Sequence, residues 1–271
     1  MFFYLFPIRK KVALHNLALC YPEKDIYWKN NIIKESYINL GINMLEFLYI
    51  PKLNKECLSK FVNFNNTDLI DKARSENKGT FFLSGHFSNW ELCAFAYPAL
   101  TDDSMHIIAK VQASRGLNKK INEYRELSGN KIIEIGFSLK EIFSLLKKNR
   151  VVTFLIDQSA HPDYSSYVNF FGKLVPAFSG PAKIALRQRP QLIIAYGLRE
   201  IDYSYKIYFE NICYADLIEN SDENVIALTQ RIQSKMEEVI RKCPGQWLWL
   251  HKRFKHIKNN KQPENPDQLL T

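Results

Sequence analysis

The sequence predicts an α/β fold, with a single domain in which helices flank a mixed central sheet. Short apolar runs typical of buried strands alternate with segments in which apolar residues recur at helical spacing. A length of 271 residues, with 46% hydrophobic and 24% charged side chains, suits one domain with a sizeable core. No internal repeat divides the chain, so we expect one domain over residues 1–257, helical at its N-terminal part, and a polar, mobile tail over residues 258–271.

The predicted elements follow one another from residue 29 onward. The first is an amphipathic helix whose apolar pattern ends at Pro51. A later apolar run leads through Gly85 into a helix, and a second buried strand ends just before Asp157. In chain order we predict a helix at 29–49, a strand at 80–83, helices at 90–97 and 139–148, a strand at 151–156, a helix at 181–187, strands at 191–196 and 205–212, and a helix at 224–241.

The charge balance predicts anionic partners. Lys and Arg number 37 against 28 Asp and Glu, which gives a net charge of +9. Phosphorylated lipids, an acidic protein and nucleic acid all fit this charge, but the chain has no groove-reading motif, which argues against nucleic acid. The five cysteines are widely spread without a CxxC pair, so we expect reduced thiols and neither a zinc site nor a redox centre.

The apolar start of the chain is short. Residues 2–6 are apolar, but Pro7 and basic residues follow, far short of the ~20 residues that cross a bilayer. No other stretch is long enough to span, so any membrane attachment is expected to be peripheral. Residues 2–6 are either a shallow membrane anchor or a turn packed on the core.

His86 and Glu91 are the first candidate catalytic residues. His86 follows the predicted strand 80–83, at the strand end where ligands of α/β sheets gather. A neutral imidazole there can take the proton of a hydroxyl that attacks an acyl thioester, and a neighbouring carboxylate would orient the ring.

A geometric condition applies to this pair. On one continuous helix the two side chains would lie about 140° apart, so they can meet only if His86 precedes the helix. Ser88 and Glu91 form an S-x-x-E pattern, in which Ser88 is the N-cap and Glu91 the third helical residue. Glu91 then either only caps the helix or also acts on His86, and free amides at the helix start could hold an oxyanion or a phosphate.

Residues 85–91, Gly-His-Phe-Ser-Asn-Trp-Glu, resemble the HxxxxE/D motif of the bacterial lipid A biosynthesis (lauroyl/myristoyl) acyltransferases, a family related to glycerolipid acyltransferases. A bare HxxxxE is common, whereas His-Phe-x-Asn-Trp-Glu is much more specific. Further blocks that resemble the family lie at residues 6–17, 154–158, 170–172, 179–183 and 244–254, in an order that covers nearly the whole chain.

The resemblance implies a glycerolipid-acyltransferase-like fold and a direct acyl transfer. By this resemblance His86 is the general base on the acceptor hydroxyl and Glu91 is its partner. The donor is acyl carrier protein or acyl-CoA, and no covalent enzyme intermediate, metal or cofactor is implied. Two features depart from the family pattern: the usual first transmembrane helix is missing, and Asp157-Gln158-Ser159 stands where Asp-Gln-Asp is frequent. The acceptor therefore stays open.

Further candidates for substrate binding each have a plainer interpretation. Asp157 can hold an acceptor hydroxyl or a basic partner, or can cap the following turn. Arg125 fits a lipid phosphate or an ordinary charged helix face, and Arg187, with Arg189 beside it, fits a phosphate or a favourable place at a helix end. The motif blocks add Asn89 and Gln158 as candidates.

The closing segment combines tryptophans with basic residues. Trp247 and Trp249 are expected in the core, while His251, Lys252, Arg253 and Lys255 are expected to contact substrate or membrane, with Arg253 as the candidate for substrate binding.

Together these features predict an O-acyltransferase that moves a fatty acyl chain to a hydroxyl of a phosphorylated saccharolipid. We expect it at the cytoplasmic face of the bacterial inner membrane, in peripheral contact with the membrane. Its acceptor is expected to be an anionic lipid, and a groove lined by Phe and Tyr is expected for the acyl chain. Alternative acceptors are a lysophospholipid, an aminolipid or a phosphoinositol mannoside. A non-catalytic basic protein that binds membranes is the alternative from another class.

Overall fold

The structure is a computed structural model that describes residues 8–135 and 139–258. The expectations for residues 2–6 and for the tail beyond Lys258 lie outside these residues. The described part is a single α/β domain built on a mixed seven-stranded sheet with the order β1-β9-β8-β2-β5-β3-β4. The strands are β1 (Val62–Asn65), β2 (Thr80–Ser84), β3 (Met105–Ala109), β4 (Lys131–Glu134), β5 (Val151–Leu155), β8 (Gln191–Arg199) and β9 (Tyr205–Asn211), and β6 (Ser165–Phe170) pairs with β7 (Lys173–Phe178) in a separate hairpin.

Helices cover both faces of this sheet. Their starts follow sequence rules, as in α3, where Asp25 accepts a hydrogen bond from the Trp28 N–H, and α10, where Ser221 does the same for Asn224. The helices are α2 (Lys10–Cys20), α3 (Ile26–Tyr49), η1 (Ile50–Lys52), α4 (Lys55–Ser59), α5 (Asp68–Ser75), α6 (Trp90–Thr101), α7 (Arg115–Glu126), α8 (Leu139–Lys147), η2 (Pro162–Tyr164), α9 (Gly180–Gln188), α10 (Asp222–Lys242) and η3 (Pro244–Gln246).

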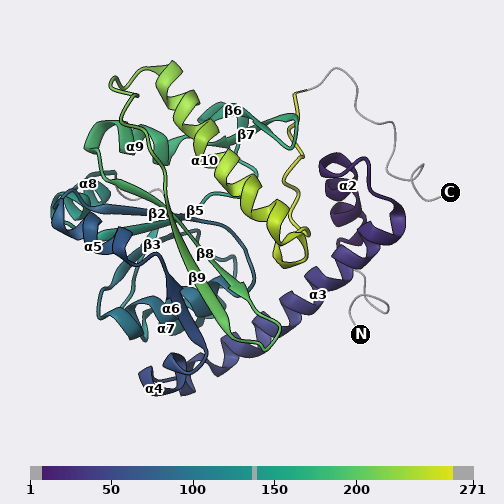
Figure 1. Ribbon diagram of the computed structural model, residues 1–271, viewed down its shortest axis with the longest axis horizontal. Coiled ribbons are helices and arrows are strands. Elements are labelled where there is room, and N and C mark those ends of the chain that lie inside the picture. Colours follow the sequence, from purple (N-terminus) through teal and green to yellow (C-terminus); the bar gives the residue numbers. More distant parts are fainter. Residues whose placement is uncertain (1–7, 136–138, 259–271) are drawn as a thin grey trace.

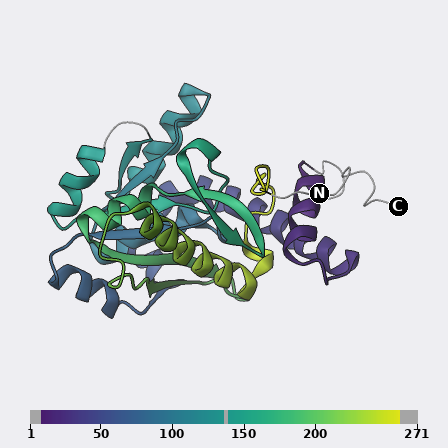
Figure 2. The same ribbon diagram turned by 90° about the horizontal axis from the view of Figure 1, so that it is seen from above.

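The two faces of the sheet carry separate cores. Apolar side chains of α8, α9 and α10 pack on one face, and those of α4, α5 and α6 pack on the other. Figure 1 shows α10 running diagonally beside the central strands, with α2 at the right of the molecule and α3 running from there toward the lower centre. In the view from above, α2 and the start of α3 lie to one side of the α/β body (Figure 2).

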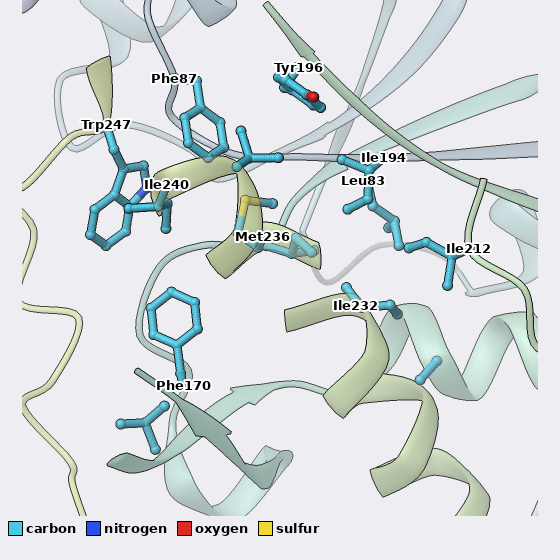
Figure 3. Packing of buried hydrophobic residues seen from close by; sticks show 14 of the residues in the cluster. Leu83, Phe87, Phe170, Ile194, Tyr196, Ile212, Ile232, Met236, Ile240 and Trp247 are labelled. Atoms are coloured by element: carbon cyan, nitrogen blue, oxygen red, sulfur yellow. The ribbon is translucent and has the colours of Figure 1, made fainter. Parts of the chain in front are cut away.

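The larger core joins α10 to the centre of the sheet. Figure 3 shows Ile232 and Met236 of α10 directed toward Leu83 of β2 and its surroundings. Phe87 and Trp247 lie close together at one end of this cluster, each at most 2% exposed. The loop after β2 is therefore anchored in the main core.

The sheet confirms the predicted fold class. β2, β5, β3 and β4 run parallel, while β9 runs antiparallel to β8, so the sheet is mixed as predicted. Each predicted helix and strand has a counterpart, with ends shifted by a few residues. β1, β3, β4, α5, α7 and the β6–β7 hairpin were not predicted. Among the described residues, no helix combines the length and apolar character needed to cross a bilayer.

Candidate functional site

Two loops at one edge of the sheet bring His86 and Asp157 together. The first loop follows β2 and the second follows β5. These strands are parallel neighbours with Ser84 opposite Leu155, and the Ile156 N–H donates to Ser84 O across 2.9 Å. Because the carboxyl ends of parallel neighbours meet at the same edge, the residues that follow them share one site.

Asp157 holds His86 through both of its carboxylate oxygens. The His86 backbone N–H donates to Oδ2 at 2.8 Å, and the ring Nδ1 lies 2.8 Å from Oδ1. Trp247 donates its indole N–H to Oδ2, also at 2.8 Å. An ionised carboxylate only accepts hydrogen bonds, so Nδ1 carries the ring proton and Nε2 keeps its lone pair. This is the tautomer that a general base needs.

The pKa shifts of the two groups describe the same interaction. Burial raises the pKa of Asp157, but the charge and hydrogen bonds of His86, with the bond from Trp247, outweigh burial and lower it to about 2. Burial lowers the pKa of His86, but the charge and hydrogen bond of Asp157 outweigh burial, Glu91 adds to them, and the pKa is raised. An imidazolium formed at His86 is therefore stabilised where it forms.

The amide of Gln158 occupies the other side of the imidazole. Its Nε2 lies 3.2 Å from His86 Nε2. The Trp90 ring packs edge-on to the imidazole, with 4.8 Å between ring centroids. The Gln158 amide thus occupies the position at the His86 lone pair that an incoming hydroxyl would take.

Glu91 is bound by Arg125. The guanidinium donates from Nε to Oε2 at 2.8 Å and from Nη2 to Oε1 at 2.6 Å, and the Trp90 indole donates to Oε1 at 3.1 Å. His86 does precede the helix, as its pairing with Glu91 would require. The carboxylate that reaches the ring is nevertheless Asp157, and Glu91 acts on His86 only through its charge.

The prediction that Ser88 is the N-cap of this helix is wrong. Asn89 is the N-cap, with its Oδ1 accepting from the Leu92 N–H at 3.0 Å, so Glu91 is the second helical residue and no capping box forms. Ser88 has a left-handed backbone with φ of 44°, and its buried hydroxyl has no hydrogen-bond partner within the described residues. Asn89 is fully buried and donates to Glu46 at 2.7 Å.

The His86 loop is held from outside by residues 246–249, which we call the C-terminal strap. Ser88 donates its backbone N–H to Gln246 O at 2.7 Å, and Leu248 donates to His86 O at 3.1 Å. The strap therefore fixes the backbone on both sides of the loop and also supplies the indole that bonds Asp157.

Polar side chains of the N-terminal helices hold the strap in turn. Ser36 of α3 donates to Trp247 O at 2.9 Å, and Asn16 of α2 donates to Trp249 O at 2.8 Å. Both tryptophans are buried, which confirms their predicted place in the core. Helices α2 and α3 thus meet the C-terminal strap beside the site.

A cavity of about 670 Å³ opens beside His86 and runs between α6 and the sheet. Its mouth is polar, with His86, Glu91, Arg125 and Gln158. Its inner wall is mainly apolar and comes from α6 and four strands of the sheet: Phe82, Cys93, Ala94, Tyr97, Met105, Ile107, Ala195, Ile207 and Phe209. A volume of this order, apolar within and polar at the mouth, is typical of ligand sites.

Gly197 borders the same cavity, and the structure leaves no room for a side chain at this position. A Cβ at this position would lie 2.2 Å from Cys93 Sγ, far inside van der Waals contact. Gly85 is restricted in the same way, since a Cβ would come within 3.1 Å of both Met236 Sδ and Asp157 Cγ. The approach of Gly85 to Asp157 explains why the residue before His86 is glycine.

The charges around the cavity favour an anion. Arg9, Lys110 and Arg125 line it against a single acidic side chain among the described lining residues, that of Glu91. His251 lines it too, and burial lowers the pKa of His251 to about 4, so this ring is neutral at neutral pH.

Several predicted substrate contacts do not border the cavity, and the first is Asn89, the buried N-cap described above. Arg187 is exposed on α9 and does not border the cavity. Arg253 is fully buried, where it donates to Pro176 O at 2.8 Å and to Gln233 Oε1 at 3.2 Å. Its place in the core, rather than at the substrate, follows from these partners. Of the predicted residues, the structure gathers His86, Glu91, Arg125, Asp157 and Gln158.

Sequence reasoning did not single out Arg9, Lys110 or the role of Trp247. Arg9 and Trp247 lie inside blocks that resemble the family, and this resemblance was the signal that could have indicated them as site residues. Lys110 follows β3, a strand that was not predicted.

A histidine held by a buried carboxylate beside a largely apolar cavity is an arrangement that suits acyl transfer. Comparison with known proteins identifies the family: residues 1–256 match bacterial lipid A biosynthesis acyltransferase. The chain belongs to this family, and it is an acyltransferase.

Three relatives show how distant the similarity is. The chain is 25% identical over 256 residues to lipid A biosynthesis palmitoleoyltransferase of Escherichia coli K12, covering 91% of this chain and 79% of the relative. It is 22% identical to the lauroyltransferase of the same organism over 250 residues, with 91% and 79% covered. It is 20% identical over 234 residues to phosphatidylinositol mannoside acyltransferase of Mycolicibacterium smegmatis, with 84% and 73% covered.

Proposed function

We propose that this protein moves a fatty acyl chain from acyl carrier protein or acyl-CoA to a hydroxyl of a phosphorylated saccharolipid, a lipid A precursor. The observation that carries the proposal is the orientation of His86. Asp157 engages its Nδ1, and its Nε2 is directed to the side where a substrate hydroxyl can replace the Gln158 amide.

His86 acts as the general base. Its Nε2 accepts the proton of the acceptor hydroxyl while the oxygen attacks the thioester carbonyl and forms a tetrahedral oxyanion. The intermediate collapses, the C–S bond breaks, and the leaving thiolate takes the proton from the His86 imidazolium. The products are an ester and a free thiol. Asp157 stays ionised throughout and orients the ring.

Glu91 has a different role from the one its sequence spacing suggests. Its ion pair with Arg125 fixes a guanidinium at the cavity mouth, and its charge supports the imidazolium from a distance. Arg125, Arg9 and Lys110 make this mouth favourable for the phosphate of an anionic acceptor.

The acyl chain enters the cavity between α6 and the sheet. Each methylene removed from water there contributes ~0.8 kcal/mol, so an apolar cavity of about 670 Å³ gives long chains a clear advantage. Groups that approach the mouth from outside are the acceptor and the pantetheine end of the donor.

A phosphoinositol mannoside is the second candidate acceptor, because one relative is named phosphatidylinositol mannoside acyltransferase. A lysophospholipid or an aminolipid fits the same site chemistry. We place the enzyme peripherally at the cytoplasmic face of the bacterial inner membrane, where acyl thioesters and anionic lipid acceptors meet.

The decisive experiment is transfer of a labelled acyl group to total membrane lipids, with the product identified by its mass. We expect His86→Ala to lower the rate by about 10²- to 10⁴-fold while the fold is retained. The matched control is His161→Ala, which removes an exposed histidine. Full activity of His86→Ala would overturn the mechanism, and the mass of the product separates the candidate acceptors.

A further inference from the structure

Over its last three turns, helix α3 directs several polar side chains inward and a set of large apolar side chains outward. Several side chains turned inward are polar: Asn39 donates to Gly245 O, and Asn43 and Glu46 accept hydrogen bonds from Arg199. Leu40 and Phe47 pack beside them on the cores. The side chains turned outward are apolar and exposed, with Leu45 at 70% and Leu48 at 67%. We call the outward set the α3 apolar face: Ile38, Met44, Leu45, Leu48 and Tyr49.

This arrangement differs from that of a helix that packs on the core of a soluble protein. A surface helix normally turns its apolar stripe inward and its charges to water. Between Ile38 and Tyr49 the only charged residue is Glu46, and it accepts hydrogen bonds from Asn89, Arg199 and Tyr205. An exposed helical face without charge marks a contact with an apolar medium or partner.

Basic and aromatic side chains rim this face. Lys52 lies over the Tyr49 ring, 5.3 Å from its centroid. On the neighbouring α7, Lys120 lies 5.0 Å from the centroid of Tyr124, whose ring is in turn 5.4 Å from that of Phe47. Lys119 is exposed beside Lys120, and no residue of α7 is buried. Tyrosine and lysine beside an apolar face are typical of a helix at a bilayer interface with anionic lipids.

The α3 apolar face lies close to the residues that form the mouth of the cavity. Glu46, on the inner side of the same turns, binds Asn89, which directly precedes Trp90 at the cavity mouth. On α7, Tyr124 in the rim is followed by Arg125 in the cavity lining. A lipid lying in a leaflet against this face is therefore next to the site.

We infer that the α3 apolar face and its lysine rim insert into the surface of an anionic bilayer and so place the cavity mouth against the lipid leaflet. This inference rests on the proposed function for the identity of the lipid that enters. A second copy of the chain is a poorer occupant, because a symmetric contact would bring Lys52 and Lys120 of both copies together in a protein of net charge +9.

The test measures co-sedimentation of the full chain with vesicles of phosphatidylglycerol and phosphatidylcholine. We expect the double variant Leu45→Glu with Leu48→Glu to bind at least about tenfold more weakly than wild type. The matched control is Ile218→Glu with Ile226→Glu, which changes two exposed isoleucines away from α3 and should leave binding unchanged.

The lysine rim has its own variant. Replacing Lys52, Lys119 and Lys120 by Gln should remove most of the preference for phosphatidylglycerol over pure phosphatidylcholine, and with it the sensitivity to salt. The inference is overturned if wild type does not bind vesicles, if the Leu45 and Leu48 variant binds as wild type does, or if gel filtration shows a dimer that this variant separates.

A second measurement separates this surface from the chemistry. Acyl transfer is measured with the acceptor dispersed in detergent and with the acceptor embedded in vesicles. The Leu45 and Leu48 variant should keep its rate in detergent and lose it on vesicles, whereas equal loss in both would show a structural role and overturn the inference. If wild type binds vesicles through this face but transfers no acyl group to the acceptor in detergent or in vesicles, the proposed function is contradicted, whereas the inference about membrane binding is supported.

Discussion

The indole of Trp247 donates to Asp157 Oδ2 across 2.8 Å, while Asp157 Oδ1 lies 2.8 Å from the His86 ring. One buried carboxylate thus joins the C-terminal strap to the candidate base. A side chain far along the sequence from His86 thus helps to keep Asp157 ionised and in position.

Trp247→Phe should therefore weaken both the fold and the chemistry. Hydrogen bonds to a charged group contribute about 1.5–3 kcal/mol, so we expect a loss of this order in the free energy of unfolding, measured by urea denaturation. The activity should fall with it. Trp28→Phe, at a half-buried tryptophan away from the site, is the control, and equal stability loss in both variants would contradict a special role for the bond.

Asp157→Asn should change the pH dependence of catalysis in a defined direction. The charge of Asp157 raises the pKa of His86, and His86 acts only when neutral. Without that charge the pKa of His86 falls, so the acidic limb of kcat/KM against pH should move to lower pH. The plateau should fall as well, because the ring loses the partner that orients it.

Gln158→Glu should shift the pKa of His86 in the opposite direction, because it adds a negative charge at the other ring nitrogen. A carboxylate placed where the amide lies, 3.2 Å from Nε2, stabilises the imidazolium and should move the acidic limb to higher pH. Shifts of the same sign in Asp157→Asn and Gln158→Glu would mean that the limb belongs to a group other than His86.

The bidentate pair of Glu91 and Arg125 should behave as one unit. Both side chains are less than a fifth exposed, so Glu91→Gln or Arg125→Met leaves an unpaired charge in a partly closed site. We expect either change to lower activity and to lower the free energy of unfolding by about 1–3 kcal/mol. If the double variant loses much less free energy of unfolding than the sum of the losses in the two single variants, the two residues are coupled. Full additivity of the losses would contradict the coupling.

Ala195→Phe should shorten the acyl chain that the enzyme prefers. Ala195 lines the inner wall of the cavity on β8, and a phenyl ring there takes volume from the chain. Competition between acyl donors of different length, with products separated by mass, measures the shift. Ile201→Phe, at a fully exposed position, is the matched control, and an unchanged chain preference in Ala195→Phe would place the chain elsewhere.

The fold was predictable because its signals are local. The helix at 29–49 and the strands at 80–83 and 151–156 each follow from a short apolar pattern, and all have counterparts in the structure. β1 and β4 have only four residues, and β3, although as long as β2, has His106 within its apolar residues, so no comparable apolar run indicates them.

The site was less predictable because its contacts are distant in sequence. Asp157 could be placed at a strand end, but its pairing with His86 depends on β5 lying beside β2, which local patterns do not specify. Ser88 fitted a capping box, yet the bond from its N–H to Gln246 and its left-handed φ move the cap to Asn89. Arg253 was predicted to contact substrate because it lies in a basic segment after two tryptophans. In the structure it is buried in the core, where it donates hydrogen bonds to Pro176 and Gln233.

The C-terminal strap has a consequence for the time at which activity appears. During synthesis, His86, Glu91 and Asp157 leave the ribosome well before residues 246–249, and until then the loop lacks its two backbone bonds and Asp157 lacks its indole donor. A nascent chain, or one cut before Gly245, therefore carries every candidate reacting group and still cannot hold them in place. The enzyme becomes competent only when the C-terminal strap has packed against α2 and α3.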